Sequence, residues 1–503
     1  MKMNKICRVI VNSGILLFSV HSTFAQTATK NYITSYHPQV AVTNEWALPG
    51  LSKEDGQRSI TYFDGLGRIE QQIQVAGSPL GYDMVTPVKY DVFGREVRKF
   101  LPYTMSIINN GTFVTADSTG QVSYYTALYG STDGTKAFSK TEFETSPLNR
   151  PLKQGAPGSV WQPNTVAASD YSIKYNYGTN SATDSVRLWT LNSSNTPVTS
   201  AFYPVRSLYK TIIWDENNNK DLSTSTSTDE YKDLLGNIVL KRTCVGSKKY
   251  STYYVYDNFK LLRFVLPPKT FEDGNFSLSP AKLNDLCYQY RYDDRNRMVK
   301  KKMPGADSII MVYDARDKLV LSQDGVLRSA NPSKWYFTKY DLTGRPVITG
   351  CTLISITIPD TIRARFKRYI QSASTPLYES KLSTGNIGYT LNNSFPSNVT
   401  NTIAETDILT ITYYDDYSHL TVSGFLPQLA YNSSYDIDTY TDNDGNIDGY
   451  FDNVKGQVSG TKVKVLDGNE YTSSAKWLFS VNYYDDRYRV IQNCRSLYHG
   501  IHS

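Results

Sequence analysis

The sequence predicts an all-β fold in which repeated antiparallel β-hairpins lie side by side in one long sheet, with two short helices in insertions. Two observations predict it. A Tyr-Asp unit followed by a turn recurs along the chain, and tyrosine is twice as frequent as phenylalanine, 40 residues against 19. Tyrosine and threonine favour a pleated surface with one wet side, whereas Asn, Asp and Gly supply turns. Repeats of this kind define the whole architecture of a chain.

The first 25 residues have the three-part layout of a secretory signal. A basic start, residues 2–8, is followed by an apolar segment, residues 9–20, and by small residues before Ala25. We expect cleavage between Ala25 and Gln26 and export to the periplasm, the cell surface or the medium. The apolar segment is too short to remain as a membrane span, and no later stretch is long enough for one.

Charge and cysteine usage exclude several classes of function. The net charge of +6 falls to +3 when the three basic residues of the signal leave, which is too little to indicate a nucleic-acid partner. The wide spacing of the remaining cysteines fits no zinc site. Whether two of them form a disulfide or all are buried thiols stays open. They are Cys244, Cys287, Cys351 and Cys494.

The repeat unit is Tyr-Asp-x-x-Gly-Arg between two alternating segments, which predicts a β-hairpin. Aspartate at the first turn position can accept hydrogen bonds from the backbone two residues on, and glycine at the last position accepts positive φ. The arginine that follows is placed to pair with the aspartate. The clearest copies have these three residues at Asp64, Gly67 and Arg68, at Asp91, Gly94 and Arg95, and at Asp341, Gly344 and Arg345.

Looser copies follow the same plan with substitutions in the turn. A single hairpin is marginally stable in water, so we expect the hairpins to stack edge to edge into one sheet. The aspartates of these copies are Asp233, Asp257, Asp293, Asp314, Asp415 and Asp485.

Two insertions have helical patterns. Ser279 and Pro280 are a cap and a first helical residue, and residues 279–287 place apolar side chains at helical spacing. Residues 360–370 are again capped and amphipathic. We therefore divide the chain into a signal peptide (1–25), an N-terminal Tyr-Asp domain (26–108), an irregular β-region or insertion (109–221), a repeat array (222–350), an insertion with a short helix (351–410) and further repeats (411–503).

The sequence contains no motif that predicts catalysis or a cofactor, and we expect a protein that is not an enzyme. Gly65 and Gly67 match a dinucleotide fingerprint only in part, because residue 70 is Glu where the third glycine should be. One loop has carboxylates around Gly445, as calcium sites do, but it lacks the glutamate of an EF-hand. An ordinary polar turn is the alternative. The candidate calcium ligands are Asp442, Asp444 and Asp448.

The repeat resembles the YD repeat of Rhs proteins, teneurins and the shell components of insecticidal toxin complexes. It is more similar still to exported bacterial YD-repeat proteins with an N-terminal domain of unknown function. The segments that carry this resemblance are 31–33, 62–68, 85–88, 90–95, 101–103, 286–292, 303–305, 335–341 and 460–465.

The resemblance implies a curved, spiral sheet wound into a hollow shell. In such proteins an Asp-Pro-containing core closes the shell and a C-terminal toxin lies inside it. No Asp-Pro dipeptide occurs here, and the chain stops at Ser503. We expect a non-enzymatic shell segment, the N-terminal part of a toxin-encapsulating protein truncated before the Rhs core. Its partners would be that core and the toxin, if they are encoded downstream.

A second function from another class is a cell-surface adhesin or glycan-binding protein. Exposed tyrosines on a β-face stack well on sugar rings. Cell-surface or glycan ligands would then be the partners. Loss of glycan binding on Tyr→Ala substitution would distinguish this function from a structural one.

Overall fold

The structure is a computed structural model, and it describes most of the chain. Everything below refers to the described residues. These are residues 8–11, 15–18, 29–40, 42, 45–107, 109–166, 169–217, 226–330, 332–354, 376–396, 402–421, 425, 429–433, 449–468, 472, 475–497 and 500–502.

The chain divides into two compact units, each described by itself. Unit 1 consists of residues 1–189 and 199–253, and unit 2 of residues 190–198 and 254–503. Two separate two-stranded sheets also occur. They pair β1 (Arg8–Val11) with β2 (Ile15–Phe18), and β12 (Arg187–Leu191) with β13 (Pro197–Phe202).

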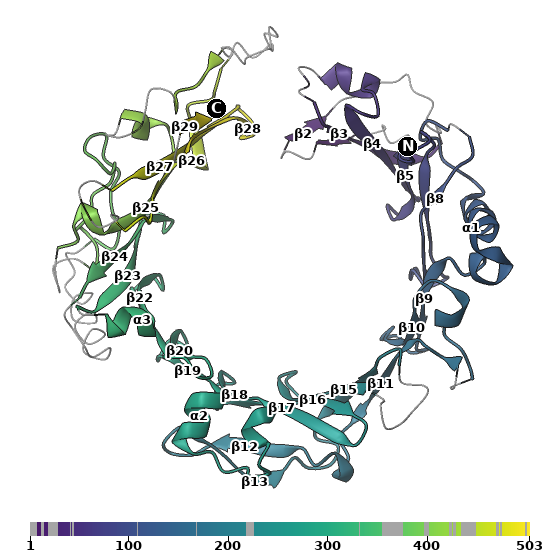
Figure 1. Ribbon diagram of the computed structural model, residues 1–503, viewed down its shortest axis with the longest axis horizontal. Helices are drawn as coiled ribbons and strands as arrows, with labels where there is room; N and C mark the ends of the chain where they lie inside the picture. The colour runs from purple at the N-terminus through teal and green to yellow at the C-terminus, as the bar shows by residue number, and fades with distance from the viewer. Residues whose placement is uncertain are drawn as a thin grey trace. The chain divides into compact units, whose positions relative to one another are not determined.

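Unit 1 contains an antiparallel sheet in which strands mostly pair with their neighbours in sequence (Figure 1). At one place the sheet branches, because β6 pairs with both β7 and β8, and β7 continues to β9. Another pairing, of β11 with β14, skips the β12–β13 segment. The strands are β3 (Asn31–Pro38), β4 (Gly56–Phe63), β5 (Ile69–Val75), β6 (Met84–Lys89), β7 (Arg98–Phe100), β8 (Tyr103–Thr104), β9 (Phe138–Phe143), β10 (Pro151–Gly155), β11 (Ile173–Thr179), β14 (Tyr209–Trp214), β15 (Thr226–Lys232), β16 (Ile238–Val245) and the first part of β17 (Lys248–Tyr256), whose residues from Tyr254 on belong to unit 2.

Alternation decides which face of this sheet is buried. In β4, Ile60 and Tyr62 point to the same face and are fully buried, as period-2 geometry requires. They pack with Ile73 of β5 and Val85 of β6 in one apolar cluster. The Tyr62 hydroxyl donates a hydrogen bond of 2.7 Å to the Gly111 carbonyl, so a long loop closes over this core.

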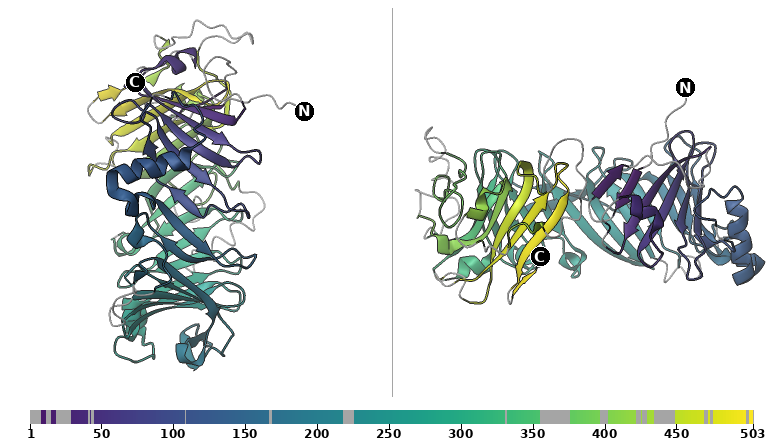
Figure 2. Two further views of the ribbon diagram at one scale, coloured as in Figure 1. Left: turned by 90° about the vertical axis from the view of Figure 1, so that its right-hand side faces the viewer. Right: turned by 90° about the horizontal axis from the view of Figure 1, so that it is seen from above.

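Residues 109–221 hold more regular structure than an irregular β-region. They contain helix α1 (Asp117–Gly134), which was not predicted, and strands that extend the unit 1 sheet. Figure 2 shows α1 against the sheet, in blue. The helix is kinked at Gly130, where φ is +79°, and its Ser-, Thr- and Gly-rich sequence has no continuous apolar stripe. That composition is typical of loops and concealed the helix.

In unit 2 every strand from β18 to β29 pairs antiparallel with the next in sequence. Figure 1 shows these strands in order, from teal to yellow. They are β18 (Leu262–Leu266), β19 (Tyr288–Tyr292), β20 (Met298–Lys302), β21 (Ile309–Tyr313), β22 (Leu319–Gln323), β23 (Lys334–Tyr340), β24 (Pro346–Leu353), β25 (Ile408–Asp415), β26 (Val454–Lys464), β27 (Trp477–Tyr484), β28 (Val490–Leu497) and β29 (Gly500–His502).

In the described part of unit 2, two short helices lie in the connections between strands. Helix α2 (Pro280–Leu286) begins where the sequence predicts, and the Ser279 hydroxyl accepts a hydrogen bond from the Lys282 backbone N–H at 3.2 Å. Helix α3 (Gly325–Ser329) is capped by Asp324. The helix expected at residues 360–370 lies outside the described residues.

The predicted mostly β fold, with long antiparallel pairing and few short helices, is confirmed. In the part of the chain that the structure describes, no helix is long and apolar enough to cross a membrane. Short 3-10 turns occupy Glu45–Gly50, Ser159–Trp161, Ala182–Asp184, Pro268–Phe271, Glu405–Asp407 and Ser418–Thr421.

Candidate functional site: the Tyr-Asp turns

One turn shows how the repeat is built. The backbone N–H groups of Leu66 and Arg68 each donate a hydrogen bond of 2.9 Å to Oδ1 of Asp64. Arg68 Nε donates to the other carboxylate oxygen at 2.8 Å, and its Nη2 lies at the same distance. These hydrogen bonds, led by the one from the Arg68 backbone N–H, hold the pKa of Asp64 below its ordinary value. A single carboxylate therefore closes the turn and positions the arginine.

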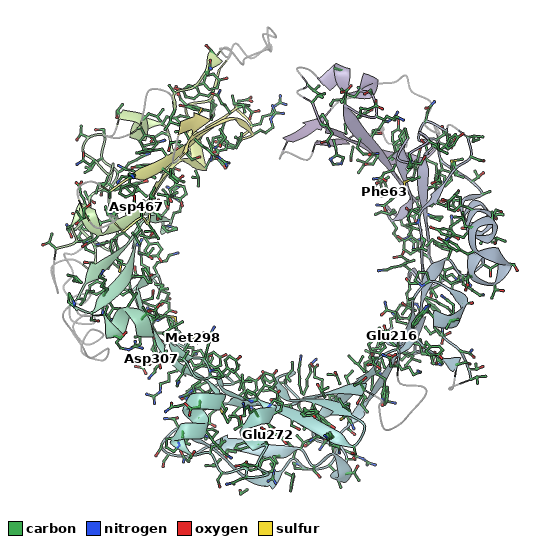
Figure 3. All side chains as sticks on the ribbon, viewed as in Figure 1. Phe63, Glu216, Glu272, Met298, Asp307 and Asp467 are labelled. Carbon is green, nitrogen blue, oxygen red and sulfur yellow. The ribbon has the colours of Figure 1, made fainter. Side chains whose placement is uncertain are left out.

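The same arrangement recurs in seven further turns. In each, the aspartate N–H donates to the carbonyl four residues on, and Oδ1 accepts from the backbone N–H of that residue. Strands end and begin at each turn: Phe63 closes β4 before the first, and Met298 opens β20 after another (Figure 3). The seven turns begin at Asp91, Asp233, Asp257, Asp293, Asp314, Asp341 and Asp485.

The last position of every turn has positive φ. Glycine occupies it in four turns, at φ from +77° to +87°. The other four place side chains of other types at φ from +60° to +63°, a region that costs L-residues about 1–2 kcal/mol each. The glycines are Gly67, Gly94, Gly236 and Gly344, and the other residues are Lys260, Asn296, Asp317 and Tyr488.

The arginine or lysine of one turn lies over the tyrosine that precedes the next aspartate. The Arg68 guanidinium is 4.4 Å from the Tyr90 ring centroid, and Arg297 is 5.1 Å from that of Tyr313. Lys318 lies 5.9 Å from the Tyr340 ring. Each contact is a cation–π interaction between consecutive repeats.

The tyrosine hydroxyls complete the connection between repeats. In the consecutive repeats of unit 2 they donate to the carbonyl of the residue five positions after the preceding turn aspartate. Tyr313 donates to the Met298 carbonyl at 2.9 Å, and Tyr340 to that of Leu319 at 2.8 Å. Tyr292 makes the corresponding bond, 3.1 Å long, to Leu262. We call this series of arginine–tyrosine contacts and tyrosine–carbonyl bonds the turn ladder.

Arginine side chains also reach the next turn directly. Arg297 Nη1 donates to the Asp314 carbonyl at 2.9 Å and to Asp317 Oδ1 at 2.8 Å. In unit 1, Arg95 Nη1 donates to Asn149 Oδ1 at 2.8 Å. Each arginine thus bonds its own aspartate through one side of the guanidinium and the following turn through the other.

Asp415 does not start a turn of this kind, contrary to its prediction as a repeat copy. It lies at the end of β25 with φ +78° and accepts two hydrogen bonds, 2.7 and 2.6 Å long, from Arg345. The Gly456 N–H donates to it as well. These bonds, the Arg345 pair first, lower the pKa of Asp415 to about 2. Arg345 also lies 4.3 Å from the Tyr414 ring, so this pair still belongs to the turn ladder.

One member of the ladder was missed in the sequence. Glu144 takes the place of aspartate in a longer turn and pairs with Arg150 at 2.7 Å. The Arg150 guanidinium lies 4.4 Å from the Tyr177 ring, and the Tyr177 hydroxyl donates to the Pro151 carbonyl at 3.0 Å. The sequence signal that could have revealed this turn is Asn149-Arg-Pro, which matches Gly344-Arg-Pro of a clear copy. Asn149 has a positive φ of +52°, as the glycine does at that position.

A buried ion pair fastens a long connection to the unit 2 sheet. Lys339 of β23 and Glu379 have completely buried side chains, with Nζ 3.1 Å from Oε1. Glu379 also accepts bonds from the Ser394 backbone N–H at 3.0 Å and from its hydroxyl at 2.7 Å. Burial lowers the pKa of Lys339 to about 8 against the opposing effect of Glu379. All groups of the pair are satisfied, which a buried charge requires.

The remaining predicted site residues that the structure describes form no assembled site. No disulfide joins the cysteines that the structure describes, Cys244, Cys287, Cys351 and Cys494, and the last three of them are buried. Within the described ranges, no group of three or more His, Cys, Asp or Glu side chains could hold a metal ion. Five predicted site residues lie outside the described residues. They are Ala25 and Gln26 at the signal cleavage and the calcium candidates Asp442, Asp444 and Asp448.

Comparison with known proteins found a family model and solved structures to which parts of this chain are similar. Residues 34–176 match the domain of unknown function DUF6443. The chain is similar to the crystal structure of TcdB2-TccC3-Cdc42, at 12% identity and a TM-score of 0.39, over 88% of this chain and 19% of that one. It is also similar to the Photorhabdus luminescens Tc holotoxin pore, at 12% identity and a TM-score of 0.37, over 88% and 18% of the two chains.

The chain spans about a fifth of the length of the structures that it resembles. No curated protein matched the sequence.

Proposed function

We propose that this chain is a non-enzymatic structural segment of an exported YD-repeat shell, the N-terminal part of a protein that encloses a toxin. The turn ladder carries this proposal. The residues that define the repeat bond to their own turn or to the next one, as Arg297 does with Asp293 and Tyr313. Their contacts therefore serve to join neighbouring repeats into the wall of the shell.

Export of the chain is part of the proposal. It rests on the basic, apolar and small-residue segments before Ala25. The partners would be the Rhs core and a toxin segment, if they are encoded downstream. The N-terminal sequence of the secreted protein tests the first point, and we expect it to begin at Gln26.

Protease protection tests the enclosing function. The native protein, secreted from its own cells, would be treated with protease and its fragments identified by mass spectrometry before and after unfolding. We expect a polypeptide that survives until the protein is unfolded. Digestion of every associated polypeptide at the same rate, together with glycan binding that is lost on Tyr→Ala substitution, would instead support an adhesin.

A further inference from the structure

Large apolar side chains project from the turns along one edge of the unit 1 sheet. Leu66, Val92, Phe93 and Leu148 occupy the tips of three consecutive turns and are 70–94% exposed. In a sheet of antiparallel neighbours, alternate connections lie at the same edge. The bond from Arg95 to Asn149 joins two of these turns directly. Leu234 and Leu235 follow on the same edge, and we call these six residues the apolar turn edge.

The turn itself does not require apolar residues at these positions. In unit 2 the equivalent third residue is polar in four of the five described turns, as Arg295, Arg316, Thr343 and Arg487, and Phe259 is the exception. The aspartate still makes the same backbone bonds there. A regular apolar row is therefore a property of unit 1, and rows of this kind mark interaction surfaces.

The charges beside the apolar turn edge cancel locally. Arg68 and Arg95 pair with Asp64 and Asp91 at 2.8 and 2.7 Å. In the turn that carries Leu148, Arg150 pairs with Glu144 at 2.7 Å. The edge thus has little net charge to attract an acidic or basic partner, and two such edges would not repel each other.

We propose that the apolar turn edge is a self-association surface that binds the same edge of a second copy of this chain. Turns on one edge are two strands apart, about 10 Å, which leaves gaps that the tips of an identical row can fill. Six side chains of about 60–120 Å² each bury about 400–700 Å² per copy, somewhat less than the roughly 800 Å² of a standard interface. The association is isologous and weak, in the micromolar range.

Sedimentation velocity of the secreted chain tests this surface. We expect a monomer–dimer equilibrium between about 1 and 500 µM. The triple variant Leu66→Thr/Phe93→Thr/Leu148→Thr should raise the dissociation constant of the dimer at least tenfold. Threonine is chosen because Thr343 occupies the same position in another turn of this chain. The matched control is Leu80→Thr, since Leu80 is 80% exposed in the connection between β5 and β6, at the opposite edge of the unit 1 sheet, and this change should leave the constant unchanged.

Circular dichroism confirms that each variant is folded before it is compared. A wild-type chain that stays monomeric over the whole range overturns the proposal, as does a triple variant that associates like wild type. Flotation with neutral phosphatidylcholine vesicles is run in parallel. A monomeric chain that floats with the vesicles, and no longer does so in the triple variant, identifies a lipid surface as the occupant and also overturns the proposal.

Discussion

At the residue scale, the aspartate of each turn accepts several hydrogen bonds at once. Asp293 accepts from the backbone N–H groups of Arg295 and Arg297, each at 3.0 Å, and from Arg297 Nε at 2.8 Å. The two backbone bonds need only an oxygen acceptor, whereas the guanidinium bond depends on the charge. Substitutions can therefore separate turn closure from ion pairing.

Asp293→Ala should lower the free energy of unfolding by about 1–3 kcal/mol, because two backbone donors and the arginine lose their acceptor. Asp293→Asn keeps an oxygen for the backbone and should cost less, about 1 kcal/mol. Urea denaturation of both variants checks this order. Equal losses would mean that the backbone bonds contribute nothing.

Gly236→Ala should destabilise the chain by about 1–2 kcal/mol, because φ at this position is +87°. No atom lies within 4 Å of an added Cβ, so backbone strain is the whole cause. Gly178 is equally open but lies in β11 without positive φ, and Gly178→Ala is the control that should be neutral or stabilising. Similar denaturation midpoints for the two variants would contradict the strain argument.

At the scale of elements, ion pairs and tyrosine bonds join one hairpin to the next. The Arg345–Asp415 pair links the turn after β23 to the end of β25 across 70 residues of sequence. Tyr340 links β23 to the start of β22 through the Leu319 carbonyl. These contacts add side-chain bonds to the backbone pairing of the strands.

The Arg345–Asp415 ion pair makes the free energy of unfolding depend on pH in the acidic range. The pKa of Asp415 is lowered to about 2 by its bonds to Arg345, whereas in the unfolded chain it is about 3.9. Its contribution is therefore complete above about pH 5 and is lost as pH falls through the folded pKa of about 2. We expect about 1 kcal/mol, after allowance for solvent screening.

Urea denaturation of the wild type and of Asp415→Asn at several pH values measures the contribution of this pair to the free energy of unfolding. The difference in stability between the two should be constant above about pH 5 and disappear by about pH 2. A difference that stays the same at both ends of the range would show that the carboxylate charge is not the cause.

Tyr340→Phe should cost about 0.5–1.5 kcal/mol, because it removes the donor to the Leu319 carbonyl while leaving the ring in place. Tyr336 of the same strand is 45% exposed and makes no such ladder bond among the described residues, so Tyr336→Phe is the control. Thermal and urea unfolding of both variants check the difference. An equal loss of stability at the two positions would show that the hydrogen bond from the Tyr340 hydroxyl does not stabilise the fold.

At the scale of the whole molecule, the sequence predicted the parts of the fold whose signals are local. A Tyr-Asp turn is specified within about six residues, so strands and turns could be placed from Asp64 to Asp485. Contacts between repeats join side chains far apart in sequence, and the Arg345–Asp415 pair was not foreseen for this reason. Glu144 was missed because a longer turn changes both the acidic residue and the spacing.

The central claim is that Tyr-Asp hairpins join side by side, each turn bonded to the next. Electron cryo-microscopy of the secreted chain, at a resolution that separates strands, tests it most directly. We predict that β18 to β29 appear as successive neighbours of one sheet, with the Arg297 guanidinium against the Tyr313 ring and Arg345 against Tyr414. Density in which these hairpins belong to separate packing units, with the arginines turned away from the tyrosines, would contradict the account.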